Sequence, residues 1–250
     1  MIATALLRSW IRRLALGGAV LALAGVALGV AAGTASAAGS GSASGSGSVN
    51  FAPAKKALLV RTDFPSGWTG QGSVSTSKSG SGKFPGDAQL ASCLGVAKSF
   101  LDTNTPSASS PTFQDKTGTV FVQDNVSVFP SAKVGARNFS TISNPKVPGC
   151  LNTVLMDPAA KAQFLGTTDG SVSVGAVTVT AAPKSILVPH ASGFTIAFDA
   201  TEQESTAHTT ITLVSMVRGT LGSQIALTSV SNAFPTSLAR HLVSTAYGRT

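Results

Sequence analysis

The sequence is poor in charge, and its basic residues are dispersed. Its 250 residues include 18 Lys and Arg against 10 Asp and Glu. Beyond residue 37 the basic residues stand singly apart from Lys55-Lys56, and no basic run is interleaved with aromatic residues. Nucleic-acid-binding surfaces instead concentrate Lys and Arg on one face, often in a recognisable motif. We therefore expect no nucleic-acid partner.

Residues and motifs that carry chemistry are also few. The three histidines, His190, His208 and His241, form no HExxH pair and no pair four residues apart. The GxSxG nucleophile elbow is absent, as are the phosphate-binding loops GxGxxG and GxxxxGK. Glu202 and Glu204 fall in an expected hairpin turn. We therefore expect a protein that is not an enzyme, with no catalytic residues, no metal and no cofactor.

The N-terminus has the order of an export signal. Three arginines within residues 8–13 precede an uncharged apolar run over residues 14–32, and Ala35-Ser36-Ala37 is a small-x-small triplet of the kind that signal peptidase cuts. We expect cleavage after residue 37. The alternative is an uncleaved membrane anchor, because about 19 apolar residues can also span a bilayer. Either form places the rest of the chain outside the cytoplasm, secreted or on the surface of the cell envelope.

After the signal, residues 38–49 are almost entirely Gly, Ser and Ala, a composition typical of a flexible linker. Residues 50–250 are then long enough for one domain with its own core. Without the three arginines of the signal, 15 basic and 10 acidic residues remain, a net charge of +5. This mild excess favours solubility and a loose attraction to acidic polymers of the envelope.

Cysteine is nearly absent, and the two that occur are Cys93 and Cys150. In an oxidising compartment an even number of cysteines predicts a disulfide. A metal site would need more ligands than two distant thiols, and a catalytic thiol would need an activating base nearby. We therefore expect one structural disulfide that closes a long loop.

The hydrophobic pattern predicts an α+β domain. Helical spacing of apolar residues predicts helices over residues 53–60, 87–101, 131–142, 151–164 and about 235–248, the fourth bent or split at Asp157-Pro158. Runs rich in β-branched and aromatic residues predict strands over 119–129, 172–181, 194–200, 206–218 and 223–230. We expect a single domain, a twisted antiparallel sheet of about five strands with flanking helices.

Three local features refine this expectation. Phe194, Ile196 and Phe198 alternate with smaller or polar residues, which predicts a sheet with one buried and one lighter face. The turn over residues 63–68 should bring its two aromatic rings close together. Residues 107–111 are expected to form a polar loop, and residues 73–77 a weak strand.

Several short segments also match a known family: Ser92-Cys93-Leu94-Gly95, the run VSVFPSA over residues 126–132, Ala136, and PKVPGCL over residues 145–151. With them the chain resembles the extracellular sensor-domain proteins of actinobacteria, which are related to the external domain of the PknH-type membrane Ser/Thr kinase. The resemblance extends over roughly residues 58–247. It implies a twisted antiparallel sheet with helices around a cleft for a ligand, and a bond between Cys93 and Cys150.

The chain departs from that family in two ways. It has no cysteines for the second disulfide of the kinase sensor domain, and only 13 residues precede the apolar run, so we expect no kinase domain in this polypeptide. Signalling by phosphorylation is therefore not expected of the chain itself.

The leading functional hypothesis is a secreted or surface-tethered, sensor-like binding module. An apolar cleft between sheet and helix would accept a small amphiphile or a component of the cell envelope. Phe194, Phe198, Val214 and Met216 are the candidates to line it, although core packing explains each of them as well. The alternatives are an envelope lipid carrier or assembly partner, and a secreted serine hydrolase that uses one of the three histidines.

Overall fold

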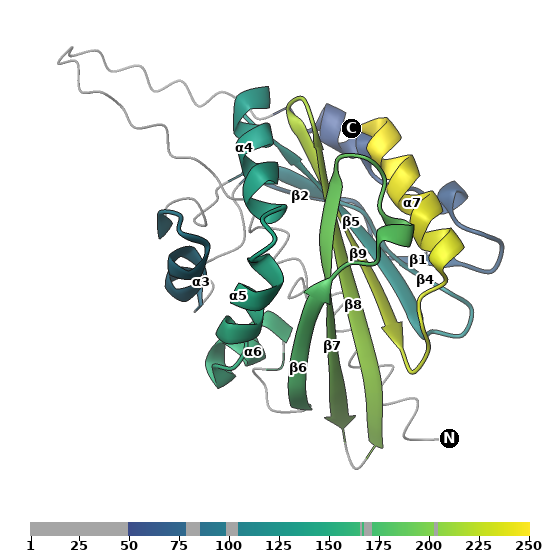
Figure 1. The fold of residues 1–250 in the computed structure, drawn as a ribbon. Coiled ribbons are helices and arrows are strands. Elements are labelled where there is room, and N and C mark those ends of the chain that lie inside the picture. The colour runs from purple at the N-terminus through teal and green to yellow at the C-terminus, as the bar shows by residue number, and fades with distance from the viewer. Residues whose placement is uncertain (1–49, 79–85, 99–104, 166, 168–171, 203–204) are drawn as a thin grey trace.

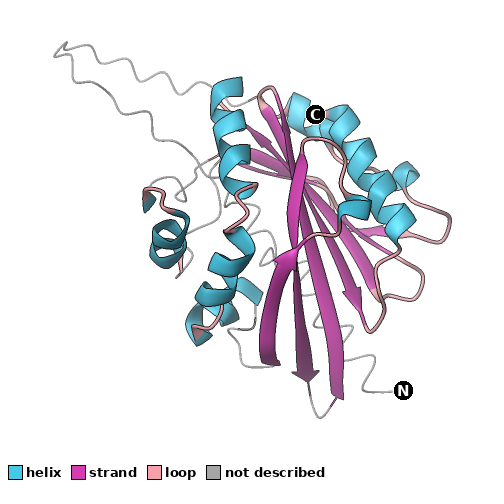
Figure 2. Cartoon of the chain, viewed as in Figure 1, coloured by secondary structure: helices cyan, strands magenta, loops and turns pink. Residues whose placement is uncertain are grey.

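An antiparallel sheet of nine strands with helices on both faces forms the part of the chain that the structure describes (Figures 1 and 2). The computed structural model describes residues 50–78, 86–98, 105–165, 167, 172–202 and 205–250. The expected export signal and linker lie outside these ranges. Among the described residues, no helix is long and apolar enough to cross a membrane.

Five long strands form the larger part of the sheet, at the positions that the β-branched and aromatic runs predicted. They are β5 (Val120–Val128), β6 (Ser173–Ala181), β7 (Ala191–Glu202), β8 (Ser205–Arg218) and β9 (Leu221–Val230). Their order in space is β5-β9-β8-β7-β6, and every neighbouring pair is antiparallel. Hairpins therefore connect β6 to β7, β7 to β8 and β8 to β9.

The expectation of about five strands is wrong, because four strands of three residues each extend the sheet beyond β5. They are β1 (Thr69–Gln71), β2 (Ser75–Ser77), β3 (Ser107–Ser109) and β4 (Thr112–Gln114). Both β3 and β4 pair with β5, while β2 pairs with β3 and β1 with β4. Each is only three residues long and carries little strand signal, although β2 lies within the weak strand expected at residues 73–77. They form because β5 offers unpaired backbone groups along its other edge. One of them, β3, replaces the polar loop expected at residues 107–111.

Two layers of helices cover the opposite faces of the sheet (Figure 1). The α5 side carries α3 (Asp87–Leu94), α4 (Ala132–Ile142), α5 (Val147–Val154) and α6 (Pro158–Leu165). The α7 side carries α2 (Ala52–Ala57), α7 (Thr236–Arg249) and the 3-10 turns η2 (Arg61–Asp63) and η4 (Lys184–Ile186).

Two of the expected helices have different bounds in the structure. The helix expected over residues 87–101 is shorter, because Gly95 adopts a left-handed backbone with φ of 70° and ends α3 at Leu94. The segment around Asp157-Pro158 divides into two helices, as the alternative of a split predicted. Asp157 caps the second of them by accepting a hydrogen bond from the backbone N of Ala160 at 2.8 Å.

Both faces of the sheet are buried where β8 and β9 run. Phe194, Ile196 and Phe198 pack on the α5 side, whereas Val214 and Met216 belong to the core beneath α7. The lighter face expected from the sequence is therefore confined to the part of the sheet that α7 leaves uncovered. On the α7 side, the expected aromatic contact is present, with the ring centroids of Phe64 and Trp68 5.0 Å apart.

Side chains cover the backbone of the edge strand β6. The amide of Asn152, on α5, donates from Nδ2 to the carbonyl of Val179 at 2.8 Å and accepts from the backbone N of Val179 at 2.7 Å. Lys161 Nζ donates to the carbonyls of Val174 and Gly175 at 3.2 and 3.3 Å. An uncovered edge is a template for pairing with another chain. These contacts therefore protect β6 from such pairing.

Replacing Asn152 by alanine should both destabilise the domain and open this edge. Loss of both hydrogen bonds to Val179 should lower the free energy of unfolding by about 1–3 kcal/mol and favour dimers paired through β6. Urea denaturation and size-exclusion chromatography measure the two effects. Thr153→Ala is the control, because among the described residues the Thr153 hydroxyl donates to the Gly149 carbonyl of the same helix and bonds to no other element. Equal behaviour of the two variants would contradict this role of Asn152.

Candidate functional site

Helix α4 faces the sheet with an unusual set of residues. Gly135, Asn138 and Ile142 follow one another at spacings of three and four, so they share one face of the helix. A Cβ atom on Gly135 would lie only 2.9 Å from both the Gly219 carbonyl and Val217 Cγ1. The missing side chain therefore lets α4 approach the turn between β8 and β9, and it brings the buried amide of Asn138 against the sheet.

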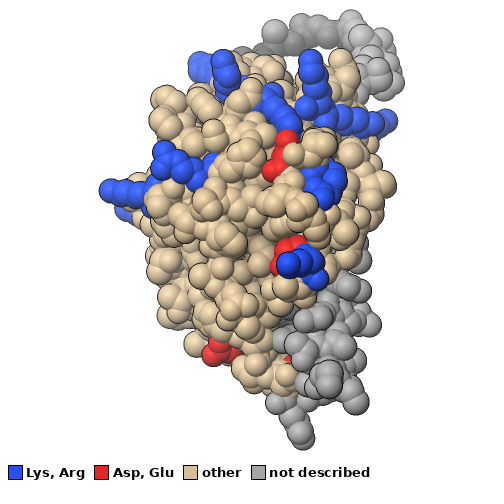
Figure 3. Space-filling view, turned by 90° about the vertical axis from the view of Figure 1, so that its right-hand side faces the viewer, with Lys and Arg blue, Asp and Glu red and all other residues tan. Residues whose placement is uncertain are grey.

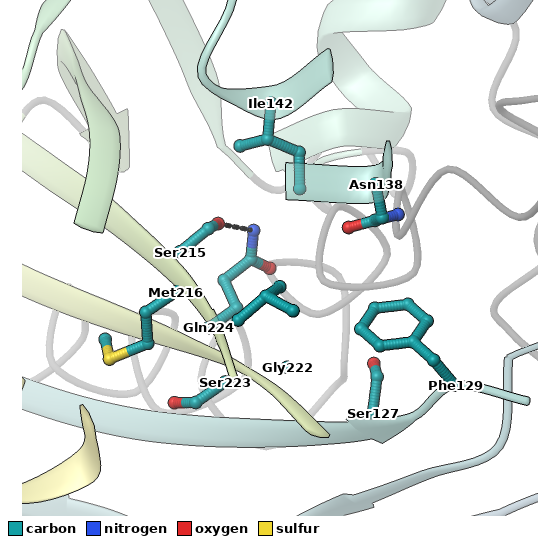
Figure 4. Close-up of a pocket in the computed structure, with 10 residues that line it drawn as sticks. Ser127, Phe129, Asn138, Ile142, Ser215, Met216, Gly222, Ser223 and Gln224 are labelled. Carbon is teal, nitrogen blue, oxygen red and sulfur yellow. Dashed lines mark hydrogen bonds between the residues drawn. The ribbon is translucent and has the colours of Figure 1, made fainter. Parts of the chain in front are cut away.

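Between α4 and strands β5, β8 and β9 lies a pocket of about 20 Å³ (Figure 4). Its walls are Ser127, Phe129, Asn138, Ile142, Ser215, Met216, Val217, Gly222, Ser223 and Gln224. The side chains of Met216 and Ser223 turn to the opposite face of the sheet, so these two contribute mainly backbone. The space suits a single group of about the size of a water molecule.

The pocket contains several polar side chains but no charged one. Gln224 Nε2 donates to Ser215 Oγ at 3.1 Å, while Gln224 Oε1 is buried without a hydrogen-bond partner among the described residues. Asn138 is 2% exposed, and its Nδ2 likewise has no hydrogen-bond partner among the described residues. In Figure 4 the nitrogen of Gln224 is joined to Ser215 by the hydrogen bond, and the oxygen of Asn138 lies on the side of Gln224. An unpaired buried polar atom costs about 1–3 kcal/mol, so these amides are ready to bind a polar group.

The close approach of α4 gives a test of how the pocket is built. Gly135→Ala should lower the free energy of unfolding by about 1–3 kcal/mol, because the new methyl group must push α4 away from the β8–β9 turn. The matched control is Gly149→Ala on α5, where a Cβ would have nothing within 4 Å. That change should leave stability equal or raise it by roughly 0.5–1 kcal/mol. Chemical denaturation gives the free energy of unfolding of both variants. A Gly135→Ala variant more stable than the wild type would contradict the close contact.

The structure does not bring the four apolar candidates for a ligand cleft together. Phe194 and Phe198 are 6% and 2% exposed in the core of the α5 side, whereas Val214 and Met216 are fully buried on the α7 side. The four therefore cannot line one cleft. Contact of either pair with a ligand remains a prediction.

The three histidines also lie apart. His208 Nδ1 lies 2.9 Å from Asp199 Oδ1 on the uncovered part of the sheet, with the two side chains 60% and 62% exposed. His190 lies on a loop, and His241 is exposed on α7. Among the described residues, no hydrogen bond links any of the three to a serine side chain, and no group of three or more His, Cys, Asp or Glu could hold a metal ion.

A second buried polar cluster lies on the α7 side around the backbone of residues 58–60. Asp124 of β5 is fully buried; it accepts hydrogen bonds from the backbone N of Leu59 at 3.1 Å and from Ser223 Oγ at 2.8 Å. Arg249, near the end of α7, donates to the Leu58 carbonyl at 2.8 Å and binds both carboxylate oxygens of Asp63 at 2.6 and 2.7 Å. Burial raises the pKa of Asp124 to about 7, although the hydrogen bonds and the nearby Arg249 oppose the rise.

Sequence reasoning did not single out Asn138, Gln224 or Asp124. The sequence did contain a signal for Asn138. Asn138 and Gly135 share a helix face with Ile142, and an amide and a glycine are unusual on the face that packs against a core. The other two stand beside polar residues in their strands, Asp124 between Gln123 and Asn125 and Gln224 after Ser223, and such polar stretches give no sign of burial.

The extracellular domain of PknH from Mycobacterium tuberculosis is a solved structure similar to this chain, with a TM-score of 0.42 and 11% sequence identity. The alignment covers 80% of this chain and 97% of that domain. It is the external domain that the sequence motifs suggested as similar. No protein-family model matches the chain, and no curated protein matches it.

Proposed function

We propose that this protein is a sensor-like binding module outside the cytoplasm, and that the pocket beneath α4 receives a hydroxyl group of an uncharged ligand. Gln224 Oε1 carries this proposal, because it is a buried acceptor without a partner among the described residues and belongs to a residue that lines the pocket. The export signal in the sequence supports the location. So does the disulfide between Cys93 and Cys150, a bond that persists in oxidising compartments.

The chemistry of the pocket favours a hydroxyl over other groups. A hydroxyl can donate to Gln224 Oε1 and accept from the amide of Asn138, whose oxygen and nitrogen exchange places when the carboxamide rotates. A carboxylate, phosphate or ammonium group would find no opposite charge among the residues that line the pocket, and burying it there would be unfavourable. Hydroxyl-rich neutral molecules, such as the sugars of envelope glycans, present the required group.

The same pocket does not favour the amphiphile expected from the sequence, nor a lipid carrier. Pockets that hold drug-sized ligands have volumes of roughly 300–1,000 Å³. The pocket beneath α4 encloses about 20 Å³, so an acyl chain would not fit into it. A single hydroxyl group at the edge of a sugar ring is small enough to enter the pocket while the rest of the sugar stays outside.

NMR titration tests the proposal directly. Glucose, N-acetylglucosamine and glycerol are added to ¹⁵N-labelled protein, and the side-chain amide resonances of Asn138 and Gln224 are followed. At least one sugar should shift both resonances in a saturable way. The Asn152 amide is the internal control, because it is hydrogen-bonded to the backbone of Val179 on the edge strand β6 and does not line the pocket.

Two variants sharpen this test. Gln224→Leu removes the unpartnered acceptor and should weaken binding of the sugar at least tenfold. Gln123→Leu, a neighbouring half-buried amide outside the pocket, should leave affinity unchanged. If no probe shifts Asn138 and Gln224, or if Gln224→Leu binds as the wild type does, the pocket holds water only and the proposal fails.

A further inference from the structure

The helical layer on the α7 side is strongly cationic. Its four elements, α2, η2, η4 and α7, contain six basic residues and one acidic residue, Asp63. The basic residues are Lys55, Lys56, Arg61, Lys184, Arg240 and Arg249. In Figure 3, which views this face, the Lys and Arg side chains gather over its upper half, while the lower half is almost free of them.

Most of these cations remain without a counter-charge. Asp63 is 8% exposed and engages both guanidinium nitrogens of Arg249, so it neutralises that residue alone. The other five basic side chains are exposed, and among the described residues none of them forms an ion pair with a carboxylate. Val60, between α2 and η2, is 46% exposed and adds an apolar side chain to the same surface.

The chain enters the described domain on this surface. Helix α2 begins at Ala52, directly after the linker over residues 38–49, and Lys55 and Lys56 lie in its last turn. These 12 linker residues are almost entirely Gly, Ser and Ala, and a Gly/Ser-rich chain of this length has a root-mean-square reach of roughly 20 Å. With the expected export signal, the apolar segment over residues 14–32 would enter the membrane, and α2 would stay within this reach of its surface for as long as the two remain joined.

We propose that the α7 side docks on anionic phospholipid headgroups of the membrane across which the chain is exported. Basic side chains near such a surface are attracted by its negative potential, and salt screens the attraction over about 10 Å at 0.1 M ionic strength. The sugar-binding proposal concerns the opposite face of the sheet, so the two are independent. Docking through α7 would leave the pocket beneath α4 facing away from the bilayer.

Vesicle binding tests the docking proposal. The protein used begins at Ala38, because the buried core residues of the described chain lie between Ala54 and Ala246 and this form keeps all of them. Sedimentation with phosphatidylcholine vesicles is compared with sedimentation at 30% phosphatidylglycerol. We expect binding to the anionic vesicles alone, and at least a tenfold loss of affinity between 50 and 500 mM NaCl.

Charge reversals locate the surface. Lys56→Glu with Arg240→Glu should reduce affinity for the anionic vesicles at least tenfold. Lys133→Glu with Lys146→Glu makes the same charge change at exposed positions on the α5 side and should reduce it less than threefold. Equal losses in the two double variants, or binding that does not depend on phosphatidylglycerol, would overturn the proposal. Tighter binding to soluble polyphosphate than to vesicles would assign the surface to a polyanion instead.

Discussion

Removing the disulfide, by replacing Cys93 and Cys150 with serine together, should lower the free energy of unfolding by about 4 kcal/mol. The two cysteines are 57 residues apart in the sequence, and the bond fixes the short helix α3 to α5. In the chain-entropy description, the covalent loop restricts the unfolded chain, and its loss gives that freedom back. Among the described residues, α3 places the apolar side chains of Leu90, Ala91 and Leu94 in the core, and Asp87 is buried as well.

Urea denaturation of the double variant and of the wild type, each with and without reductant, measures this effect. Reduction of the wild type is the control, because it breaks the bond without changing a side chain, and it should reproduce most of the loss. Hydrogen exchange should show the amides of α3 losing protection first. A loss below about 1 kcal/mol in both reduced and mutated protein would mean that packing alone holds α3.

The five long strands were predicted correctly because their own side chains favour the extended conformation. Strands β5 to β9 are long runs of β-branched and aromatic residues, and such residues favour a sheet in many contexts. Strands β1 to β4 depend on something else. Ser107 pairs with Ser127 and Ser75 with Ser109, and these partners lie 20 and 34 residues away along the chain. The local pattern therefore gave only the weak strand expected at residues 73–77, where β2 lies, and did not indicate the other three.

The candidate site could not be predicted for a related reason. In the register of the sheet, Phe194 lies opposite Leu213, so the odd-numbered residues of β8 join it on the α5 side and Val214 faces the other way. Because both faces of β8 are buried, its hydrophobic pattern does not tell whether the odd-numbered or the even-numbered residues face the helices of the α5 side. The pocket likewise exists only because Gly135 lets α4 cross the β8–β9 turn, a tertiary contact that spacing within α4 cannot specify.

Asp124 should make stability fall as the pH rises from about 4 to 7. Its pKa is 3.8 in the unfolded chain and about 7 in the folded protein, because burial disfavours the charged form. Between these two values the folded state holds a proton that the unfolded state has lost. The stability from this proton is therefore fully present below pH 3.8 and is lost as the pH rises through the folded pKa.

Asp124→Asn should remove this pH dependence of stability, because asparagine has nearly the shape of aspartic acid but does not titrate. The variant and the wild type should have similar stability at pH 4, where the carboxyl group is protonated in the folded state. At pH 8 the variant should be more stable by roughly 4 kcal/mol, because no ionised carboxylate is buried beside Leu59 and Ser223. Urea denaturation of both proteins across pH 4–8 gives the difference, in which the other titrating groups cancel.

Asp115 supplies a control of opposite sign in the turn between β4 and β5. Burial raises the pKa of Asp115, but hydrogen bonds from Thr117, Thr119 and Val120 together lower it below the ordinary value. Its stabilising effect is therefore present at neutral pH and lost as the pH falls, so Asp115→Asn should be destabilising at pH 7 and less so at pH 3. If Asp124→Asn followed that pattern instead, Asp124 would be ionised in the folded protein at neutral pH, held so by Arg249 and its hydrogen-bond donors.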